Sequence, residues 1–117
     1  MSAMPVKASV TKSSRPERIR HPEVDSFDLA TIMRALGDPV RIEMVREVDA
    51  EGEMICTDLY DRLGLPRSTA SYHLRQLREA GVTRARAAGT NRIVSVRRED
   101  LESRFPGLVD VILRDRA

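Results

Sequence analysis

One stretch of the sequence, residues 66–81, combines an apolar stripe on one side of a predicted helix with polar and cationic groups on the other. Ala70, Leu74 and Leu77 recur at intervals of four and three residues, which is the spacing of a buried helical face. The opposite side carries hydroxyl, phenol and guanidinium groups and no acid: Arg67, Ser68, Thr69, Ser71, Tyr72 and Arg75. Such side chains hydrogen-bond to base edges and phosphate oxygens without repelling a polyanion. This stretch is therefore the candidate surface for binding a nucleic acid.

Turn residues bound this predicted helix, and a shorter helix precedes it. Pro66 is suited to a helix start, where its missing N–H needs no acceptor, and Gly81 to the left-handed residue that ends a helix. Residues 57–64 predict the shorter helix, which Leu65 and Pro66 join to the longer one by a tight turn. Two helices joined in this way, the second with a polar and basic outer face, are typical of a helix-turn-helix.

Two alternating segments follow the polar helix and predict a β-hairpin. Residues 82–88 alternate as a strand does, residues 89–91 are turn formers, and residues 92–97 alternate back. A two-stranded hairpin directly after such a helix is typical of the wing of a winged helix. Arginines on a wing are suited to the DNA backbone or to a narrow, electronegative minor groove. Three are expected to point outward together: Arg84, Arg86 and Arg92.

Positive charge is concentrated around these elements. The formal net charge is only +2. Between residues 62 and 98, however, nine arginines accompany one acid, Glu79, which gives a local charge of +8. The rest of the chain carries eleven basic and seventeen acidic residues, or −6. This separation is expected where a protein lies against phosphates; the alternative is a solvated, arginine-rich surface.

The N-terminal part of the chain predicts an arm and a first helix. Residues 1–22 are rich in Ser, Lys, Arg and Pro without apolar periodicity, and we expect a disordered basic arm, either a flexible tail or a contact to DNA phosphates. The first helix is expected to begin at an N-cap, Asp25 or Ser26, and to end at Leu36. Its apolar residues nearly encircle it, which indicates burial on more than one side, as at a subunit interface.

Further elements are expected between this helix and the polar one, and at the end of the chain. Asp38 is the predicted N-cap of a second helix, which an acidic loop of residues 49–53 follows. Residues 54–56 predict a short extended connection to a third helix, with Thr57 as its N-cap. After the hairpin, residues 98–113 predict a last helical region whose apolar stripe is wider than a small domain needs. That stripe is a candidate dimerisation surface.

Composition limits the class of protein. A chain of 117 residues is expected to form one domain. No apolar run reaches the roughly 18 residues of a membrane span, and no apolar block follows the N-terminal basic residues as in a secretory signal. The single cysteine fits a cytoplasmic location. No Ser/Cys–His–acid arrangement, glycine-rich phosphate loop or metal-ligand set is evident, so we expect no enzyme, no cofactor and no metal site.

The order of these elements and three segments resemble the ArsR family of bacterial repressors. The segments are residues 35–41 (Ala-Leu-Gly-Asp-Pro-Val-Arg), Asp58-Leu59 and residues 68–81, and the resemblance covers about residues 26–113. It implies a mainly α-helical winged helix-turn-helix with a small β-hairpin over residues 23–117, dimerising through its terminal helices. It further implies a homodimeric regulator that binds a palindromic operator in double-stranded DNA and represses transcription until an effector lowers its affinity for DNA.

In metal-sensing members of this family, a Cys-x-Cys-Asp-Leu motif begins the third helix and its thiolates bind the metal. The corresponding segment of this chain is Ile-Cys-Thr-Asp-Leu at residues 55–59, so its one cysteine stands at the middle, non-ligand position. Zinc and arsenite sites need three or four soft or imidazole ligands, and we therefore expect an effector other than a metal. Cys56 precedes a helix N-terminus, which lowers the pKa of a thiol. It is a candidate redox or electrophile sensor or, alternatively, a small buried apolar residue.

The predicted DNA contacts come from the polar helix and the wing. In the major groove we expect Arg67, Ser68, Thr69, Ser71, Tyr72 and Arg75, and on the wing Arg84, Arg86 and Arg92. His73 is expected to be bonded within the fold rather than to a ligand, and Arg41 to bond a carboxylate or a phosphate. One alternative from another class is a winged helix that binds a protein instead of DNA.

Overall fold

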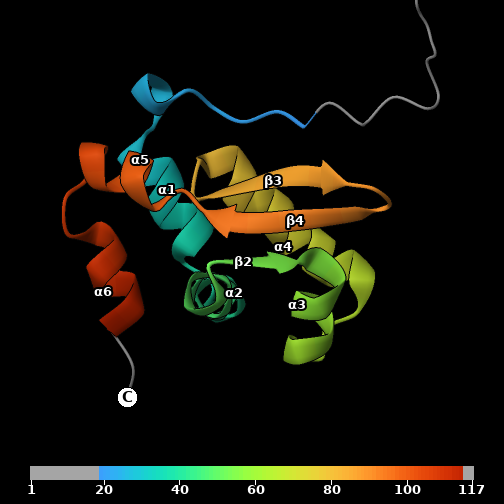
Figure 1. The fold of residues 1–117 in the computed structure, drawn as a ribbon. Helices are drawn as coiled ribbons and strands as arrows, with labels where there is room; N and C mark the ends of the chain where they lie inside the picture. The colour runs from blue at the N-terminus through green and yellow to red at the C-terminus, as the bar shows by residue number, and fades with distance from the viewer. Residues whose placement is uncertain (1–18, 115–117) are drawn as a thin grey trace, which may run out of the picture.

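The computed structural model describes residues 19–114, in which six α-helices and a 3₁₀ helix accompany three strands (Figure 1). In chain order they are η1 (Val24–Ser26), α1 (Leu29–Leu36), α2 (Pro39–Glu51), β2 (Glu53–Ile55), α3 (Cys56–Leu63), α4 (Arg67–Ala80), β3 (Thr83–Ala88), β4 (Asn91–Val96), α5 (Arg98–Arg104) and α6 (Leu108–Arg114). The predicted mainly α-helical winged helix-turn-helix is confirmed. Most of the predicted arm, residues 1–18, lies outside the described range.

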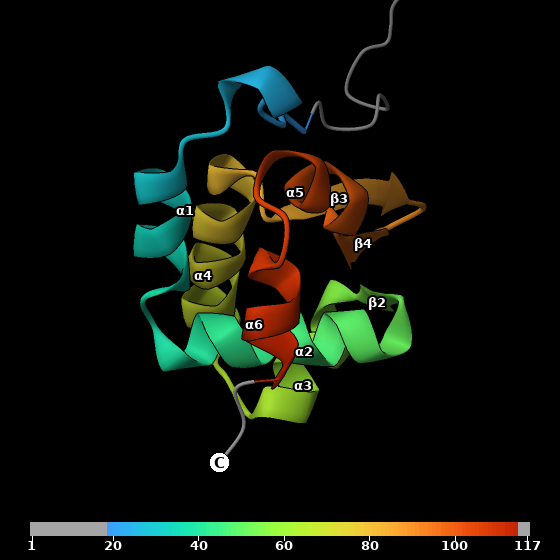
Figure 2. The ribbon, with the colours of Figure 1, turned by 90° about the vertical axis from the view of Figure 1, so that its left-hand side faces the viewer.

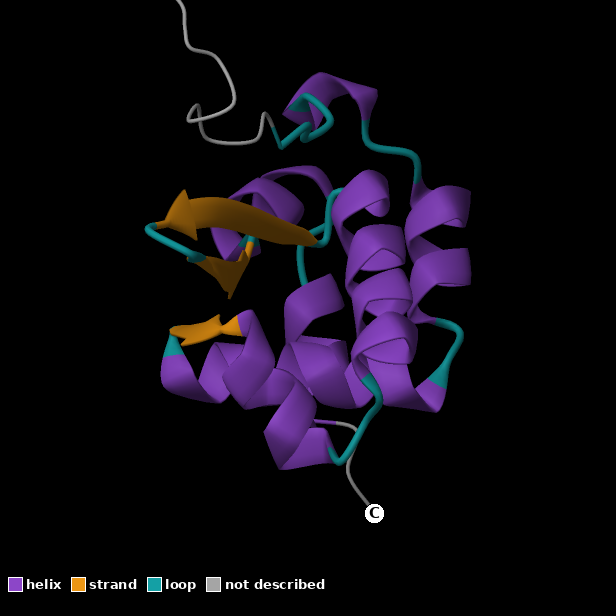
Figure 3. Cartoon of the chain, turned by 90° about the vertical axis from the view of Figure 1, so that its right-hand side faces the viewer, coloured by secondary structure: helices purple, strands orange, loops and turns teal. Residues whose placement is uncertain are grey.

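The sheet has one strand more than the predicted hairpin. β3 and β4 pair antiparallel as expected, with Ala85 opposite Val94. β2 pairs with the other edge of β4, Met54 lying opposite the same valine, so the strand order is β2-β4-β3. Figure 3 shows this small sheet beside the helices. The predicted hairpin is confirmed. The short extended connection predicted over residues 54–56 forms a third strand of the same sheet, which the sequence did not indicate because three residues are too few to show alternation.

Side-chain caps decide where the first two helices begin. The Asp28 carboxylate accepts hydrogen bonds from the N–H of Thr31 at 3.0 Å and from its hydroxyl at 2.8 Å. These bonds lower the pKa of Asp28 and start α1 at Leu29, so the predicted caps Asp25 and Ser26 are wrong. Asp38 caps α2 as predicted, accepting from the N–H of Val40 at 2.8 Å.

Two boundaries around β2 also differ from the predictions. α2 continues to Glu51, so the acidic residues expected in a loop mostly belong to the helix. α3 begins at Cys56 directly after the strand, without a side-chain cap, and Thr57 is therefore inside the helix. The chain passes from strand to helix with no loop in which a threonine cap would be needed.

The apolar stripes of the helices meet in one core. Ala70 and Leu77 of α4 have no exposed surface, and Leu74 is also buried, as their spacing predicts. α4 packs beside α1, which both side views show, and against the inner face of the hairpin (Figures 2 and 3). Among the largest fully buried side chains are Ile32, Met44, Leu59, Leu77 and Leu101.

Some apolar side chains of the terminal helices remain at the surface. Leu29 and Met33 on α1 are 44% and 49% exposed, and Val111 on α6 is 64% exposed. α1 and α6 lie at the end of the molecule away from the tip of the hairpin (Figure 1). α1 therefore buries one side in the core and leaves an apolar side uncovered within a single chain.

Gly81 fixes both the end of α4 and the path of the segment before α1. Its backbone has φ +94°, in the left-handed region, and a Cβ there would lie 2.5 Å from the ring of Phe27. That ring is buried and lies under the guanidinium of Arg97 at 4.9 Å. Gly64, at the end of α3, has φ +64° but open space around it.

Replacing these two glycines by alanine separates backbone strain from steric exclusion. Gly64→Ala should lower the free energy of unfolding by about 1 kcal/mol, the cost of a left-handed alanine. Gly81→Ala should cost a further 1–3 kcal/mol or so, because the new methyl group also displaces Phe27. Urea unfolding followed by circular dichroism measures both, and equal losses would contradict the close approach to Phe27.

Candidate nucleic-acid interface

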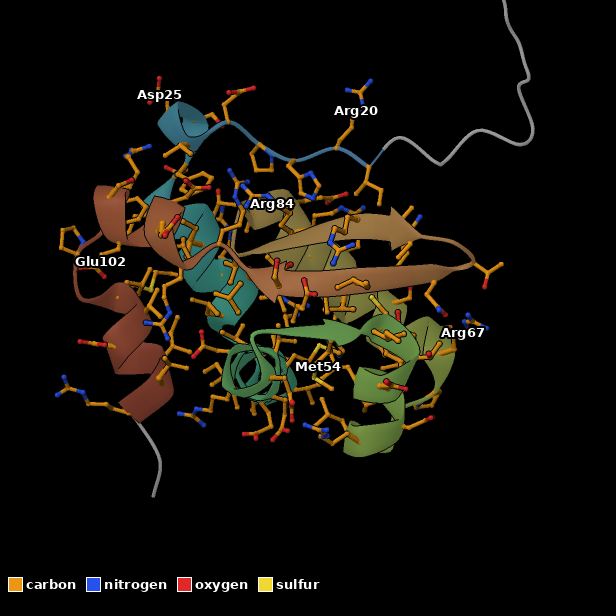
Figure 4. All side chains as sticks on the ribbon, in the orientation of Figure 1. Arg20, Asp25, Met54, Arg67, Arg84 and Glu102 are labelled. Atoms are coloured by element: carbon orange, nitrogen blue, oxygen red, sulfur yellow. The ribbon has the colours of Figure 1, made fainter. Side chains whose placement is uncertain are left out.

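The polar side of α4 lies at the surface. Because Ala70, Leu74 and Leu77 are anchored in the core, the rotation of the helix about its axis is fixed. All six side chains predicted to contact DNA from this helix belong to exposed residues: Arg67, Ser68, Thr69, Ser71, Tyr72 and Arg75. Figure 4 shows Arg67 at the same end of the molecule as the tip of the hairpin. Pro66 at the N-cap begins this surface and Gly81 ends it.

Tyr72 lies close to two guanidinium groups on this surface. The ring is 46% exposed, with Arg41 5.6 Å and Arg75 5.9 Å from its centre. Arg41 also donates a hydrogen bond to Nδ1 of His73 at 3.0 Å and another to the carbonyl of Ala35 at 3.2 Å. His73 is thus bonded within the fold as expected, whereas the carboxylate expected for Arg41 is replaced by an imidazole and a carbonyl.

The three wing arginines do not share one face of the hairpin. In the register of the sheet, Arg84 lies opposite Ser95, Arg86 opposite Ile93, and Arg92 opposite Ala87. Successive residues of a strand point to opposite faces. Arg84 and Arg86 therefore lie on one face and Arg92 on the other, where it borders a cavity together with residues of α4. The expectation that all three point outward together is corrected.

Ion pairs divide the nine arginines of residues 62–98 into two groups. In the described part of the chain, five of them contact acids from other elements. These pairs are Arg62 with Glu47 and Glu51, Arg84 and Arg97 with Asp100, Arg86 with Glu53, and Arg98 with Asp49. Three others lie on α4 and form no ion pair within residues 19–114: Arg67, Arg75 and Arg78. Much of the charge separation in the sequence is thus neutralised within the fold.

The pairs of Arg84 and Arg86 are exposed, so they do not exclude contact with DNA. Their N–O distances are both 3.1 Å, and the side chains are about half exposed. Exposed pairs of this kind contribute only about 0–1 kcal/mol, so a phosphate can replace the carboxylate at little cost. The three arginines of α4, Arg67, Arg75 and Arg78, form no ion pair within residues 19–114 and need no such exchange.

The segment before α1 is bound to the hairpin and α5. The N–H of Ala85 donates to Nε2 of His21 at 3.0 Å, and Arg97 donates to the carbonyl of Pro22 at 2.8 Å. Arg104 donates to the carbonyls of Val24 and Phe27. Burial and the nearby charge of Arg97 lower the pKa of His21, which favours the neutral imidazole that accepts this bond.

Comparisons with known proteins agree with this arrangement. Residues 36–86 match a helix-turn-helix domain family. An uncharacterized HTH-type transcriptional regulator of Bacillus subtilis, YceK, is 32% identical over 84 residues, which are 71% of this chain and 84% of that protein. The homodimeric winged helix-turn-helix DNA-binding domain Mb0332 of Mycobacterium bovis, described as "a possible ArsR-family transcriptional regulator", has a TM-score of 0.60 at 28% identity, covering 72% of this chain and 76% of that one. The repressor PagR of Bacillus anthracis has a TM-score of 0.56 at 26% identity, covering 63% and 84% of the respective chains.

Cys56 is an internal residue of the fold. Only 8% of it is exposed, and burial raises the pKa of its thiol, although the charge of Arg78 opposes this. No helix within residues 19–114 is both long and apolar enough to cross a membrane. Over the same residues, no three or more His, Cys, Asp or Glu side chains are grouped so as to hold a metal ion.

Alkylation of Cys56 by iodoacetamide tests its predicted sensor role. Because its pKa is raised, the thiolate fraction at pH 8 is smaller than for an ordinary cysteine and grows only as the pH rises further. We expect the folded chain to react about tenfold or more slowly than the same chain in guanidinium chloride. Mass spectrometry measures the rate, with Cys56→Ser as the control for labelling elsewhere. Equal rates in the two states would favour a reactive thiol.

Proposed function

We propose that this chain, which belongs to the ArsR family of winged helix-turn-helix transcriptional regulators, represses transcription as a homodimer that a non-metal effector releases from DNA. The chain is a DNA-binding transcriptional regulator. The proposal concerns repression, the homodimer and the effector. One observation carries the proposal: the apolar stripe of α4 is buried, which leaves its hydroxyl and guanidinium side exposed. This role involves no catalysis. It requires a location in the cytoplasm.

The proposed interface with DNA places α4 in the major groove. A major groove about 12 Å wide admits one α-helix, whose exposed side chains then reach base edges and phosphates. Arg67, Ser68, Thr69 and Tyr72 are exposed toward such a duplex, and Ser71 and Arg75 lie on the side facing the hairpin. Arg92 would support the same backbone, while Arg84 and Arg86 would exchange their carboxylates for phosphates at the outer face of the wing.

A homodimer is supported by the apolar surface at the end of the molecule away from the wing. Leu29 and Met33 of α1 and Val111 of α6 are the exposed large apolar side chains of that end. Mb0332, which shares the fold, is homodimeric. Two-fold symmetry would present two copies of α4 to half-sites about 34 Å apart, or a multiple of that distance, and hence to a palindromic operator.

Replacing Arg75 by alanine tests the DNA interface. A guanidinium that reads a base contributes about 1–3 kcal/mol, so Arg75→Ala should weaken specific binding about tenfold or more. Arg62→Ala is the matched control, because Arg62 is engaged with Glu47 and Glu51 on α2 and should leave the affinity unchanged. Fluorescence anisotropy with the DNA upstream of the encoding gene measures both. Equal affinities of Arg75→Ala and the unmodified chain would contradict the proposed interface, and no binding by the unmodified chain would favour a protein-binding role.

Introducing a charge into the apolar surface tests the dimer. Met33→Lys would bury an unpaired ammonium in each half of the interface, which should raise the dissociation constant of the dimer roughly 100-fold or more. Ala50→Lys places the same charge on an exposed residue of α2 and should leave the dimer intact. Sedimentation velocity distinguishes the two results. A dimer that survives Met33→Lys would place the subunit interface elsewhere.

A further inference from the structure

A cavity of about 320 Å³ lies beneath the wing, between α3, α4 and the facing side of β3 and β4. Its walls include Tyr60 of α3, Ser71 and Arg75 of α4, and Arg92 of β4. A second cavity of about 280 Å³ adjoins it toward the tip of the hairpin and shares Tyr60, Ser71 and Arg92 with it. The larger cavity lies at the lower end of the range of small-molecule sites, which is about 300–1,000 Å³.

The residues around the two cavities carry positive charge without acids. Arg75, Arg78 and Arg92 border the larger cavity, and Arg67 borders the smaller one. No Asp or Glu of the described chain is among the residues that line either. The guanidinium groups of Arg75 and Arg78 at the wall of this partly enclosed site attract an anion.

Arg78 is the member of this group that no DNA contact accounts for. It follows Arg75 by one turn of α4 but lies deeper, and its Nε atom is buried without a hydrogen-bond acceptor among the described residues. A buried N–H of a guanidinium is costly to leave unpaired, so such groups in native proteins call for an explanation. Arg78 lines the larger cavity together with Cys56 and Thr83, which places it beneath the wing.

We propose that this cavity binds a small molecule carrying a phosphate group, and that its occupation weakens DNA binding. Guanidinium groups match phosphate oxygens with paired hydrogen bonds, and the hydroxyls of Tyr60 and Ser71 supply further donors at the same walls. The inference rests on the proposed function, because Arg75 and Arg92 would contact either the ligand or the duplex. A ligand bound under the wing is thereby in competition with the operator.

The phosphate group has two sources, a free molecule or the DNA backbone, and the position of Arg78 favours the first. Its Nε is enclosed, so the rigid backbone of a duplex, held at the exposed side of α4, does not reach it. A small anion entering the cavity does reach this wall. The volume of the cavity, about 320 Å³, also favours a free molecule, because it accommodates a small phosphorylated compound.

The first arm of the test detects binding directly. The full chain labelled with ¹⁵N is titrated with inorganic phosphate, and with sodium chloride of the same ionic strength, while the arginine Nε–H signals are recorded by NMR. We expect a saturable shift of the Arg78 signal, identified by its loss in Arg78→Gln, with phosphate alone. No saturable shift, or the same shift in chloride, overturns the proposal.

The second arm separates a free ligand from a DNA phosphate. Millimolar phosphate should weaken operator binding by the unmodified chain about fivefold or more relative to chloride. Arg78→Gln should lose this difference and keep its affinity in chloride, Arg78→Lys should restore part of the difference, and Arg20→Gln, an exposed arginine outside the cavities, should behave as the unmodified chain. If Arg78→Gln, with an unchanged melting temperature, binds DNA much more weakly in chloride, Arg78 serves the DNA backbone and the proposal is overturned.

The two arms also distinguish failure of this inference from failure of the proposed function. If the unmodified chain does not bind DNA in chloride, the proposed function fails, whereas the NMR titration still reports on the cavity. If DNA is bound and phosphate has no effect on Arg78, the cavity is no phosphate site and the regulator remains. Each result therefore supports or overturns one of the two statements.

Discussion

The burial of three apolar side chains on α4 is the constraint on which the other features depend. Ala70, Leu74 and Leu77 lock this helix against α1 and the hairpin, and they thereby fix which of its residues face outward. With that rotation fixed, Tyr72 and Arg75 lie at the surface while Arg78 faces the underside of the wing. One packed stripe thus produces both a surface suited to a duplex and a charged cavity behind it.

The arrangement of charge follows from pairing over long distances in the sequence. Acids of α2, β2 and α5 neutralise the arginines on the outer face of the wing and on α3, as with Glu53 and Arg86 or Glu47 and Arg62. The arginines that form no ion pair within residues 19–114 lie on α4. A net charge counted over residues 62–98 therefore overstates the basic surface, because it cannot include partners that the fold brings from elsewhere. The smaller group of arginines on α4 is therefore a more specific indication of a binding surface than the net charge of the whole stretch.

The sequence predicted those parts of the fold that local chemistry decides. Pro66 and Gly81 marked the ends of α4, and Asp38 marked the start of α2, because each acts through its own backbone. The prediction failed where several nearby residues could serve as the N-cap of α1. Asp28 is the cap because it accepts two hydrogen bonds from Thr31, and no local feature of the sequence excluded Asp25. The third strand and the face occupied by Arg92 depend on pairing with β4, which no single segment reveals. The predicted DNA contacts remain predictions, although the α4 residues among them are exposed.

The segment that carries His21 also covers one edge of the sheet. β3 is an outer strand of the sheet, and an unprotected outer strand is a template on which another chain adds its own strand. Here the imidazole of His21 accepts a hydrogen bond from the N–H of Ala85, and the segment runs alongside β3 (Figure 1). Since folding lowers the pKa of His21, this hydrogen bond is present at neutral pH and is lost as acid protonates the ring. Acid would thus free the N–H of Ala85 at this edge, while Arg97 and Arg104 still hold the segment to the fold.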